Sequence, residues 1–184
     1  QSVILTGATL TSGGTFDHFR RQVGLTDADE HLEGSPFDYE SRALLLVPKD
    51  IPEPYDSEYP NALAAAIVDL VKAADGRTMV LFTAYASLRA VQRAIRAPLN
   101  AQGIKVLAQG VDGSAPRILA SFLQDPKSVL LGTNSFWEGI DVSPGSLKVL
   151  VLARLPFPVP TDPVFVARSE LYDNPFTEYT IPKA

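Results

Sequence analysis

The chain of 184 residues carries 46% hydrophobic residues, a net charge of −5 and no cysteine. This composition excludes a disordered chain, a disulfide-stapled domain and a thiolate metal site. The charge is uneven, because residues 1–60 have a balance of −7 and residues 61–184 a balance of +2. The overall acidity argues against a nucleic-acid partner, but a local basic face can still bind phosphate.

The sequence gives no sign of a membrane or secretory protein. Its apolar runs all fall short of the roughly 20 residues that a membrane span needs, and its start has no signal-peptide pattern. We therefore expect no membrane partner, and the lack of cysteine fits a cytoplasmic location. His18 and His31 share no metal-ligand spacing, so we expect both at the surface and no metal site. The chain starts at Gln1, just before a strand-like run, and we expect it to be part of a longer protein.

The first sixty residues predict two strands and one helix. Residues 3–5 and 43–47 are short apolar runs of the strand type. Between them, apolar residues at helical spacing predict a helix that ends near Gly24, with Thr11 or Ser12 as its cap.

After residue 60, helices and strands alternate. Apolar runs of the strand type lie at residues 79–82, 105–107, 129–131 and 147–153. Helical spacing recurs at residues 63–74, 88–95 and 115–123, a further helix is expected at 163–172, and the tail from 176 is expected to be irregular. This alternation is typical of an α/β fold with a mostly parallel sheet covered by helices on both faces. A single domain is the favoured interpretation of this length.

Each of the last four predicted strands ends in a polar or glycine-containing group. These groups are Thr83-Ala84-Tyr85, Gln109-Gly110, Gly132-Thr133-Asn134 and Arg154-Leu155-Pro156-Phe157. In a parallel sheet they lie along one edge, where ligands of such folds bind. Hydroxyls, an amide, exposed backbone N–H groups and aromatic faces suit a sugar-phosphate chain whose bases stack. The alternative is that these are ordinary turn residues.

An arginine series follows the first of these groups. Arg89, Arg93 and Arg96 are four and three residues apart, so they share one helix face. The series is either a phosphate-facing stripe or an ordinary solvated face.

The stretch 128–145 combines the only tryptophan with a carboxylate pair. Glu138 and Asp141 flank Gly139, and they can hold a ribose hydroxyl, a metal-bound water or an arginine. A general acid–base pair, as in glycosidases, is the weaker interpretation. Trp137 either stacks on a base or plugs the sheet edge. The chain has no GxxxxGK[ST] loop and no acidic magnesium box, so its residues cannot bind and hydrolyse ATP alone.

Several blocks of the sequence resemble DinG-type helicases, bacterial relatives of the XPD group in helicase superfamily 2. The blocks are residues 6–10, 81–85, 109–110, 132–141 and 155–157, in the order of that family. The FWEGID sequence at 136–141, followed by LPF, is the most specific of them. The resemblance covers nearly the whole chain.

This resemblance implies a RecA-like three-layer domain over residues 1–184, the second motor domain of an ATP-dependent DNA helicase, ending before the family's arginine-finger motif. In the family, two RecA-like domains clamp ATP and move along single-stranded DNA, unwinding it 5′ to 3′. The implied partners are single-stranded DNA and the first RecA-like domain of the same parent chain. The implied location is the bacterial cytoplasm, at the nucleoid.

The resemblance also implies the cofactors and two alternatives. The full-length enzyme would use ATP and Mg²⁺, and its first domain would carry an iron–sulfur cluster in many members. This fragment alone would bind none of them and would be inactive. Some members of the family are instead exonucleases without helicase activity, so a motor-like domain of a 3′–5′ exonuclease is one alternative. A nucleic-acid-binding module is the other.

Roles for individual residues follow from the same match. Thr6, Gly7, Ala8 and Thr9 would couple the nucleotide to DNA, with Gly7 standing where the family usually has serine. Glu138, Gly139 and Asp141 would face ATP. Together with the strand-end and arginine candidates, the expected DNA contacts are Thr83, Tyr85, Arg89, Arg93, Gln109, Gly110, Thr133, Asn134 and Trp137.

Overall fold

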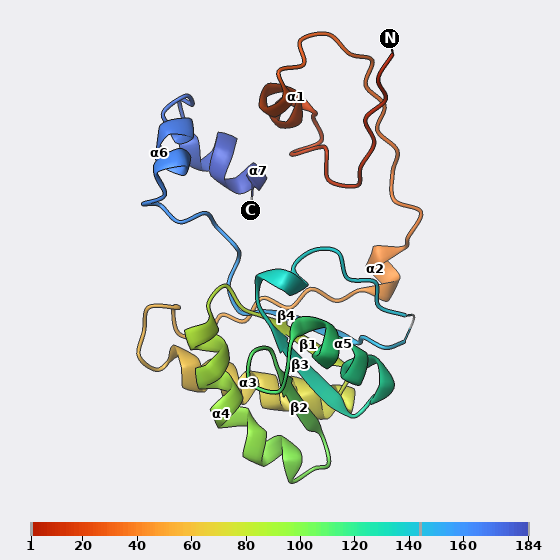
Figure 1. The fold of residues 1–184 in the computed structure, drawn as a ribbon, viewed down its shortest axis with the longest axis vertical. Helices are drawn as coiled ribbons and strands as arrows, with labels where there is room; N and C mark the ends of the chain where they lie inside the picture. The colour runs from red at the N-terminus through yellow and green to blue at the C-terminus, as the bar shows by residue number, and fades with distance from the viewer. Residues whose placement is uncertain (1, 144, 184) are drawn as a thin grey trace. The chain divides into compact units, whose positions relative to one another are not determined.

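The protein, described here by a computed structural model, divides into two compact units (Figure 1). Unit 1 comprises Gln1–Leu46 and Pro156–Ala184, and unit 2 comprises Val47–Leu155. The structure describes residues 2–143 and 145–183. Whether residues 1–184 act as one motor domain stays a prediction.

Unit 2 is built on a four-stranded sheet in which every pairing is parallel. The strands are β1 (Thr78–Leu81), β2 (Lys105–Ala108), β3 (Ser128–Gly132) and β4 (Val149–Leu152). They lie in the order β2-β3-β1-β4, so β2 and β4 form the two edges. The predicted parallel sheet is confirmed, and each strand falls within or close to its predicted apolar run.

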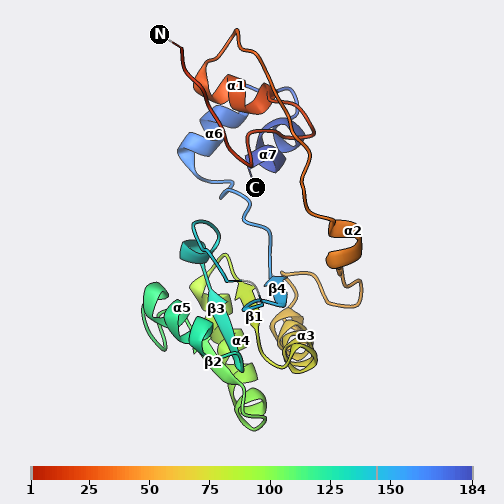
Figure 2. The same cartoon turned by 90° about the vertical axis from the view of Figure 1, so that its right-hand side faces the viewer.

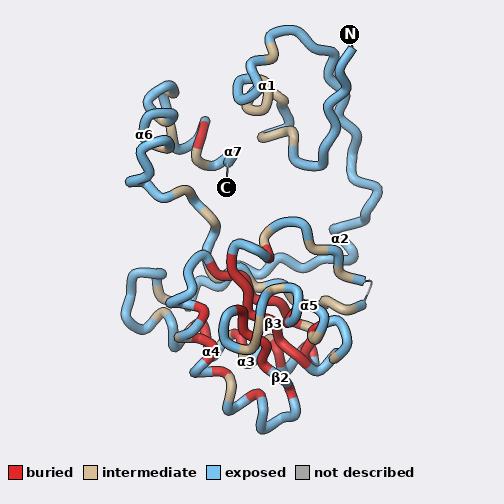
Figure 3. Tube along the Cα trace, viewed as in Figure 1, coloured by how far each residue is buried: buried red, intermediate tan, exposed pale blue. Residues whose placement is uncertain are grey.

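Helices cover both faces of this sheet. On one face α3 (Tyr59–Ala74) and α4 (Tyr85–Asn100) pack over the sheet, and their apolar side chains share one core with those of the strands. On the other face α5 (Ala115–Gln124) contributes Ile118 and Phe122 to a second core. The buried residues of the unit gather along β1, β2 and β3 (Figure 3), whereas the edge strand β4 alternates between intermediate and exposed residues. The predicted α/β three-layer architecture is confirmed.

Unit 1 consists of short helices and irregular chain (Figure 2). Its helices are α1 (Asp17–Val23), α2 (Tyr39–Arg42), α6 (Pro163–Ser169), η2 (Phe176–Thr180) and α7 (Ile181–Lys183). Tyr179 is its central side chain, 1% exposed. The Tyr179 ring stacks on Phe165 at 5.5 Å and on Tyr172 at 5.2 Å between ring centroids.

The two strands predicted in the first fifty residues are wrong. Residues 3–5 and 43–47 are irregular, and their large apolar side chains are at least 49% exposed. An apolar run adopts strand structure only when a neighbouring strand supplies hydrogen bonds and a packing surface. Among the described residues no strand pairs with either run.

Other local predictions in unit 1 also need correction. The first helix begins at Asp17 without a side-chain cap, because Ser12 instead exchanges backbone hydrogen bonds with Thr15 in a turn. His18 is not a free surface residue, since its ring lies 6.2 Å from that of Tyr179 and its Nδ1 is buried. The tail from residue 176 forms η2 and α7 because Tyr179 anchors it.

No helix in the described part of the chain is long and apolar enough to span a membrane.

The turn between α3 and β1 leaves no room for a side chain at Gly76. Its φ is +89°, and an added Cβ would lie 2.5 Å from the carbonyl oxygen of Pro126 and 2.8 Å from the nitrogen of Ser128. We expect Gly76→Ala to lower the free energy of unfolding by about 2–4 kcal/mol, because left-handed backbone strain adds to a clash with backbone atoms.

Chemical denaturation followed by the fluorescence of Trp137, the only tryptophan, measures this loss. Gly34→Ala is the control, because nothing lies within 4 Å of the added Cβ. Equal stability of the two variants would contradict the described turn.

Candidate nucleic-acid interface

The carboxyl ends of the four strands meet at one edge of unit 2. In the parallel register, Leu81 of β1 pairs with Gly132 of β3 and with Leu152 of β4. Backbone hydrogen bonds extend the sheet by one residue, since Phe82 N donates to Gly132 O at 2.9 Å and Gln109 N donates to Leu131 O at 3.0 Å. The polar groups that follow the strands therefore lie along a shared edge, which we call the carboxyl edge.

A buried side-chain link joins two of the predicted DNA contacts. Gln109 is 6% exposed, and its Oε1 accepts hydrogen bonds from Thr133 N at 2.8 Å and Thr133 Oγ1 at 3.1 Å. Its Nε2 donates to Ser135 Oγ at 3.3 Å. Gln109 and Thr133 thus organise the carboxyl edge from within, whereas the role of Ser135 gave no signal in the sequence.

An open pocket of about 450 Å³ lies at the same edge. Its lining residues are Tyr85, Gln109, Gly110, Val111, Gly113, Ser114, Ala115 and Ser135. Gly110 has a φ of +72°, and a Cβ there would stand 3.6 Å from the Tyr85 ring. The N-cap residue Ser114 and the first residue of α5, Ala115, belong to the lining, so the positive end of that helix dipole lies at the pocket.

Trp137 also supports the carboxyl edge. Its Nε1 donates to Phe82 O at 3.3 Å, and its ring packs against the core under α5. The ring of the neighbouring Phe136 packs directly on Gly132, and a Cβ added at Gly132 would lie 2.5 Å from the Phe136 Cδ2 atom. These contacts support the interpretation of Trp137 as a plug, and its stacking on a base stays a prediction.

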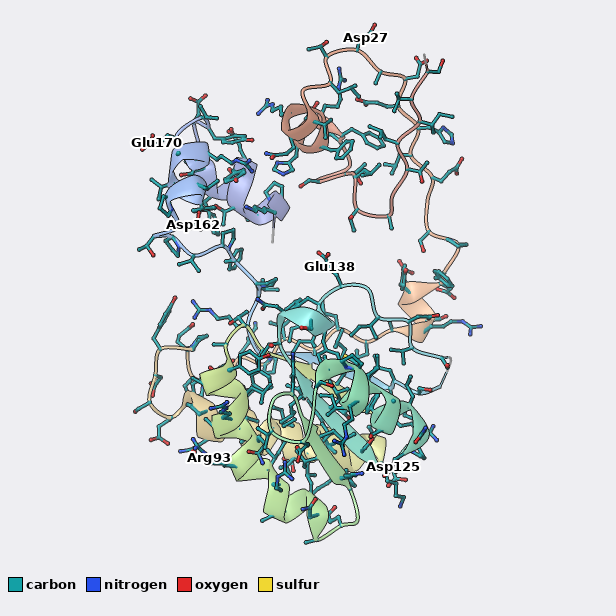
Figure 4. All side chains as sticks on the ribbon, in the orientation of Figure 1. Asp27, Arg93, Asp125, Glu138, Asp162 and Glu170 are labelled. Carbon is teal, nitrogen blue, oxygen red and sulfur yellow. The ribbon has the colours of Figure 1, made fainter. Side chains whose placement is uncertain are left out.

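The remaining candidates of unit 2 are exposed. Thr83 follows β1, and Asn134 begins the short helix η1 (Asn134–Phe136). Glu138, Gly139 and Asp141 lie in the exposed loop after η1, with Gly139 at a φ of +72°. Glu138 points away from the sheet in Figure 4.

The arginine series separates into two parts. Arg89 and Arg93 are exposed on α4, and Arg93 points outward from the helix in Figure 4. Arg96 is instead engaged, because its Nη2 lies 2.6 Å from Asp112 Oδ2. The candidate stripe is therefore reduced to two free side chains.

The proposed coupling residues lie in unit 1. Thr6, Gly7, Ala8 and Thr9 are all exposed and lead into a turn. They belong to a different unit from the carboxyl edge, so their coupling role stays a prediction. In the described residues, no group of three or more His, Asp or Glu side chains is placed to hold a metal ion.

Two tyrosines fix the chain where it leaves β4. The Tyr59 hydroxyl donates to Ala153 O. Burial raises the pKa of Tyr59, and the positive charge of Arg154 partly opposes this effect. Arg154 Nη2 donates to the Tyr55 hydroxyl at 2.8 Å, and its guanidinium lies 5.1 Å from the centroid of the Tyr55 ring. The spacing of these residues in sequence gave no hint of the arrangement.

A parallel sheet between two helical layers, with polar groups gathered at its carboxyl edge, defines a RecA-like α/β domain. Residues 67–184 match the family described as the helicase C-terminal domain. The match covers more than half of the chain, and the chain belongs to this family.

Individual relatives agree with this assignment. The chain is 35% identical to the ATP-dependent DNA helicase YoaA of Haemophilus influenzae over 98% of its length. It is 34% identical to the 3′-5′ exonuclease DinG of Bacillus subtilis over 100% of its length, and 38% identical to the ATP-dependent helicase DinG of Mycobacterium tuberculosis (strain H37Ra) over 91%. The chain covers only 28%, 21% and 25% of the full lengths of these three relatives, in the same order. The resemblance to DinG-type helicases is confirmed.

The Tyr59 contact predicts a dependence of stability on alkaline pH. The folded-state pKa lies above the ordinary value of 10.0, so the folded protein holds this proton more tightly than the unfolded chain. The stabilisation that the protonated Tyr59 hydroxyl gives to the folded state is fully present below pH 10, and it is lost as the pH rises through the folded-state pKa. We expect Tyr59→Phe to cost about 1 kcal/mol at pH 8, and we expect the difference from the wild type to narrow above pH 10.

Urea denaturation at a series of pH values from 8 to above 10 measures this. The control is Tyr55→Phe, because Tyr55 is 83% exposed and its loss should change stability little. A Tyr59→Phe deficit that stays constant or grows above pH 10 would contradict the assignment.

Proposed function

We propose that this chain is the second motor domain of an ATP-dependent 5′–3′ DNA helicase that translocates on single-stranded DNA. ATP would bind at the interface with the first RecA-like domain of the same parent chain. The observation that carries this proposal is the carboxyl edge, where the Gln109–Thr133 link and the open pocket bring the strand-end candidates together. Membership in the helicase C-terminal domain family supports it.

The chemistry of the pocket fits a nucleic-acid backbone. None of the residues that line it is acidic, and they offer two serine hydroxyls, Ser114 and Ser135, beside the start of α5. Such donors bind phosphate oxygens without sequence preference. The Tyr85 ring is 46% exposed at the rim, so it is free to stack on a base. Arg89 and Arg93 on the same helix would add charge attraction to the backbone.

The nucleotide side is proposed for the exposed loop after η1. The carboxylates of Glu138 and Asp141 can accept hydrogen bonds from ribose hydroxyls. Two carboxylates would repel a triphosphate, so these side chains fit the sugar and not the phosphates of ATP. Phosphate and Mg²⁺ binding are therefore proposed for the first RecA-like domain of the parent protein.

The same segment would couple the two ligands. Thr133 sits at the carboxyl edge and bonds to Gln109, while Asp141 lies eight residues further along the chain. Between them, Phe136 and Trp137 are packed into the core of unit 2. A segment anchored in this way can transmit a shift at its nucleotide end to its DNA end, because packed cores do not deform continuously.

A second candidate function has one observation in its favour. The Bacillus subtilis relative is named a 3′-5′ exonuclease, and it matches the whole of this chain at 34% identity while the chain spans 21% of it. A motor-like domain in a nuclease parent, or a nucleic-acid-binding module only, would explain the same carboxyl edge. ATP-dependent unwinding by the full-length protein supports the helicase, whereas release of nucleotides from 3′ ends without ATP supports the nuclease.

Charge reversal on α4 tests the DNA side. In the full-length protein we expect Arg89→Glu with Arg93→Glu to weaken binding of single-stranded DNA at least tenfold. The slope of log affinity against log salt should fall by about 0.7 for each lost phosphate contact. Fluorescence anisotropy with an oligothymidylate at several salt concentrations measures both quantities.

The matched control is Lys72→Glu with Lys148→Glu, which changes the net charge equally. Both lysines are exposed at the opposite edge, since Lys72 lies near the end of α3 and Lys148 directly precedes β4. If the two double variants bind DNA equally well, the arginines are an ordinary solvated face.

Removal of one carboxylate tests the nucleotide side. In the full-length protein we expect Asp141→Ala to lower DNA-stimulated ATP hydrolysis about 10- to 100-fold, the effect of losing one charged hydrogen bond. Phosphate release in the presence of saturating single-stranded DNA measures it. Asp69→Ala is the control, because Asp69 is an exposed carboxylate on α3. Unchanged hydrolysis by Asp141→Ala, or turnover by the isolated 184-residue chain, would contradict the proposed division of the ATP site.

A further inference from the structure

The loop between β2 and α5 forms one wall of the pocket at the carboxyl edge. Its backbone closes on itself, since Gly110 N donates to Gly113 O at 2.9 Å and Asp112 N donates to Ala108 O at 2.9 Å. Gly110 and Gly113 have φ values of +72° and +156°. The shape of this loop therefore depends on the contacts that hold Asp112 in place.

Asp112 supplies that anchor through one carboxylate oxygen. Asp112 Oδ2 accepts a hydrogen bond from Ala108 N at 2.8 Å and a second from Arg96 Nη2 at 2.6 Å. β2 is an edge strand, and the N–H of Ala108 points away from its only strand partner because the neighbouring Gln109 N donates to β3. Asp112 therefore satisfies a backbone donor that the sheet leaves unpaired.

The other partner of Asp112 ties the loop to a helix. Arg96 lies on α4, and with the Gln92 carboxamide turned so that its oxygen faces the arginine, Gln92 accepts from Arg96 Nη2 at 3.0 Å. The side chains of Arg96 and Asp112 are only 33% and 24% exposed, so solvent screens their attraction less than that of a surface pair. The same helix begins with Tyr85, which lines the pocket opposite the loop.

We propose that Arg96 and Asp112 are positioning residues for the DNA site. Their ion pair would hold the loop of Gln109 and Gly110 against α4 and so set the width of the pocket in which the DNA backbone lies. The inference rests on the proposed function of the carboxyl edge. It also assigns Arg96 a role different from that of Arg89 and Arg93, because its guanidinium already pairs with Asp112.

Binding of an oligothymidylate to the full-length protein tests this pair. The variants are Arg96→Gln, Asp112→Asn and their combination, each first shown to be folded by thermal denaturation followed by circular dichroism. We expect each single variant to raise the Kd about tenfold, the effect of one lost charged hydrogen bond. The double variant should be no weaker than either single variant, because both remove the same interaction.

Two further readouts separate positioning from direct contact and from general stability. The salt slope of binding should stay at the wild-type value, whereas a lost phosphate contact would lower it by about 0.7. Arg96→Lys should recover part of the affinity, because an ammonium group can still pair with Asp112. The control is Asp75→Asn, which removes the 3.3 Å ion pair between Asp75 and Lys127 in the same unit. Asp75 caps the end of α3, just before β1, and is far from the β2–α5 loop in sequence.

Three results would overturn the inference: wild-type affinity in the single variants, a double variant whose effect is the product of the two, or a lowered salt slope in Arg96→Gln. If the wild-type protein binds no oligonucleotide, the proposed DNA site itself fails. The loop is then judged by amide hydrogen exchange at Gly110 and Val111. Faster exchange in Asp112→Asn supports the anchor, and unchanged exchange overturns it.

Discussion

The carboxyl edge of unit 2 depends on the hydrogen bonds that the Gln109 side chain accepts from Thr133. This link crosses from the end of β2 to the end of β3 and is nearly excluded from water. A buried amide that satisfies a backbone N–H and a hydroxyl together fixes a single arrangement, since breaking it would leave buried polar atoms without partners. This contact fixes Thr133, the residue directly before η1, from which the chain continues toward Asp141.

The rest of the edge is arranged around that link in two layers. Gln109, Thr133 and Trp137 face inward and hold the strand ends together through hydrogen bonds to each other and to Phe82. Thr83, Tyr85 and Asn134 face outward and are exposed. This division suits a ligand that moves, because the supporting groups stay bonded while the exposed groups exchange water for successive nucleotides.

The sequence predicted the sheet of unit 2 well because its strands are continuous apolar runs followed by polar groups. Residues 79–82 and 129–131 show this pattern plainly, and parallel pairing then brings their ends to one edge. Residues 3–5 and 43–47 have the same apolar character but find no partner strand in the described chain, and composition cannot reveal a missing partner. The first helix lies at Asp17–Val23 and ends at Gly24 as predicted, but its predicted cap at Thr11 or Ser12 is wrong, because a Ser12–Thr15 turn competes with capping.

The side-chain links of the site escaped prediction for a different reason. Gln109 and Thr133 are 24 residues apart in sequence, and Arg96 and Asp112 are 16 apart. Neither pair has a spacing that a helix or strand would bring together, so only the fold places them in contact. The candidate list from sequence therefore mixed residues that support the edge with residues that a ligand can reach.

The most direct test of the account is amide hydrogen exchange of the full-length protein with and without saturating oligothymidylate. DNA at the carboxyl edge should slow exchange in residues 83–89, 109–115 and 133–136. Exchange in the turns at the opposite edge, residues 75–77 and 125–127, should not change. Protection of those opposite turns without protection of the carboxyl edge would contradict the central claim that this edge binds single-stranded DNA.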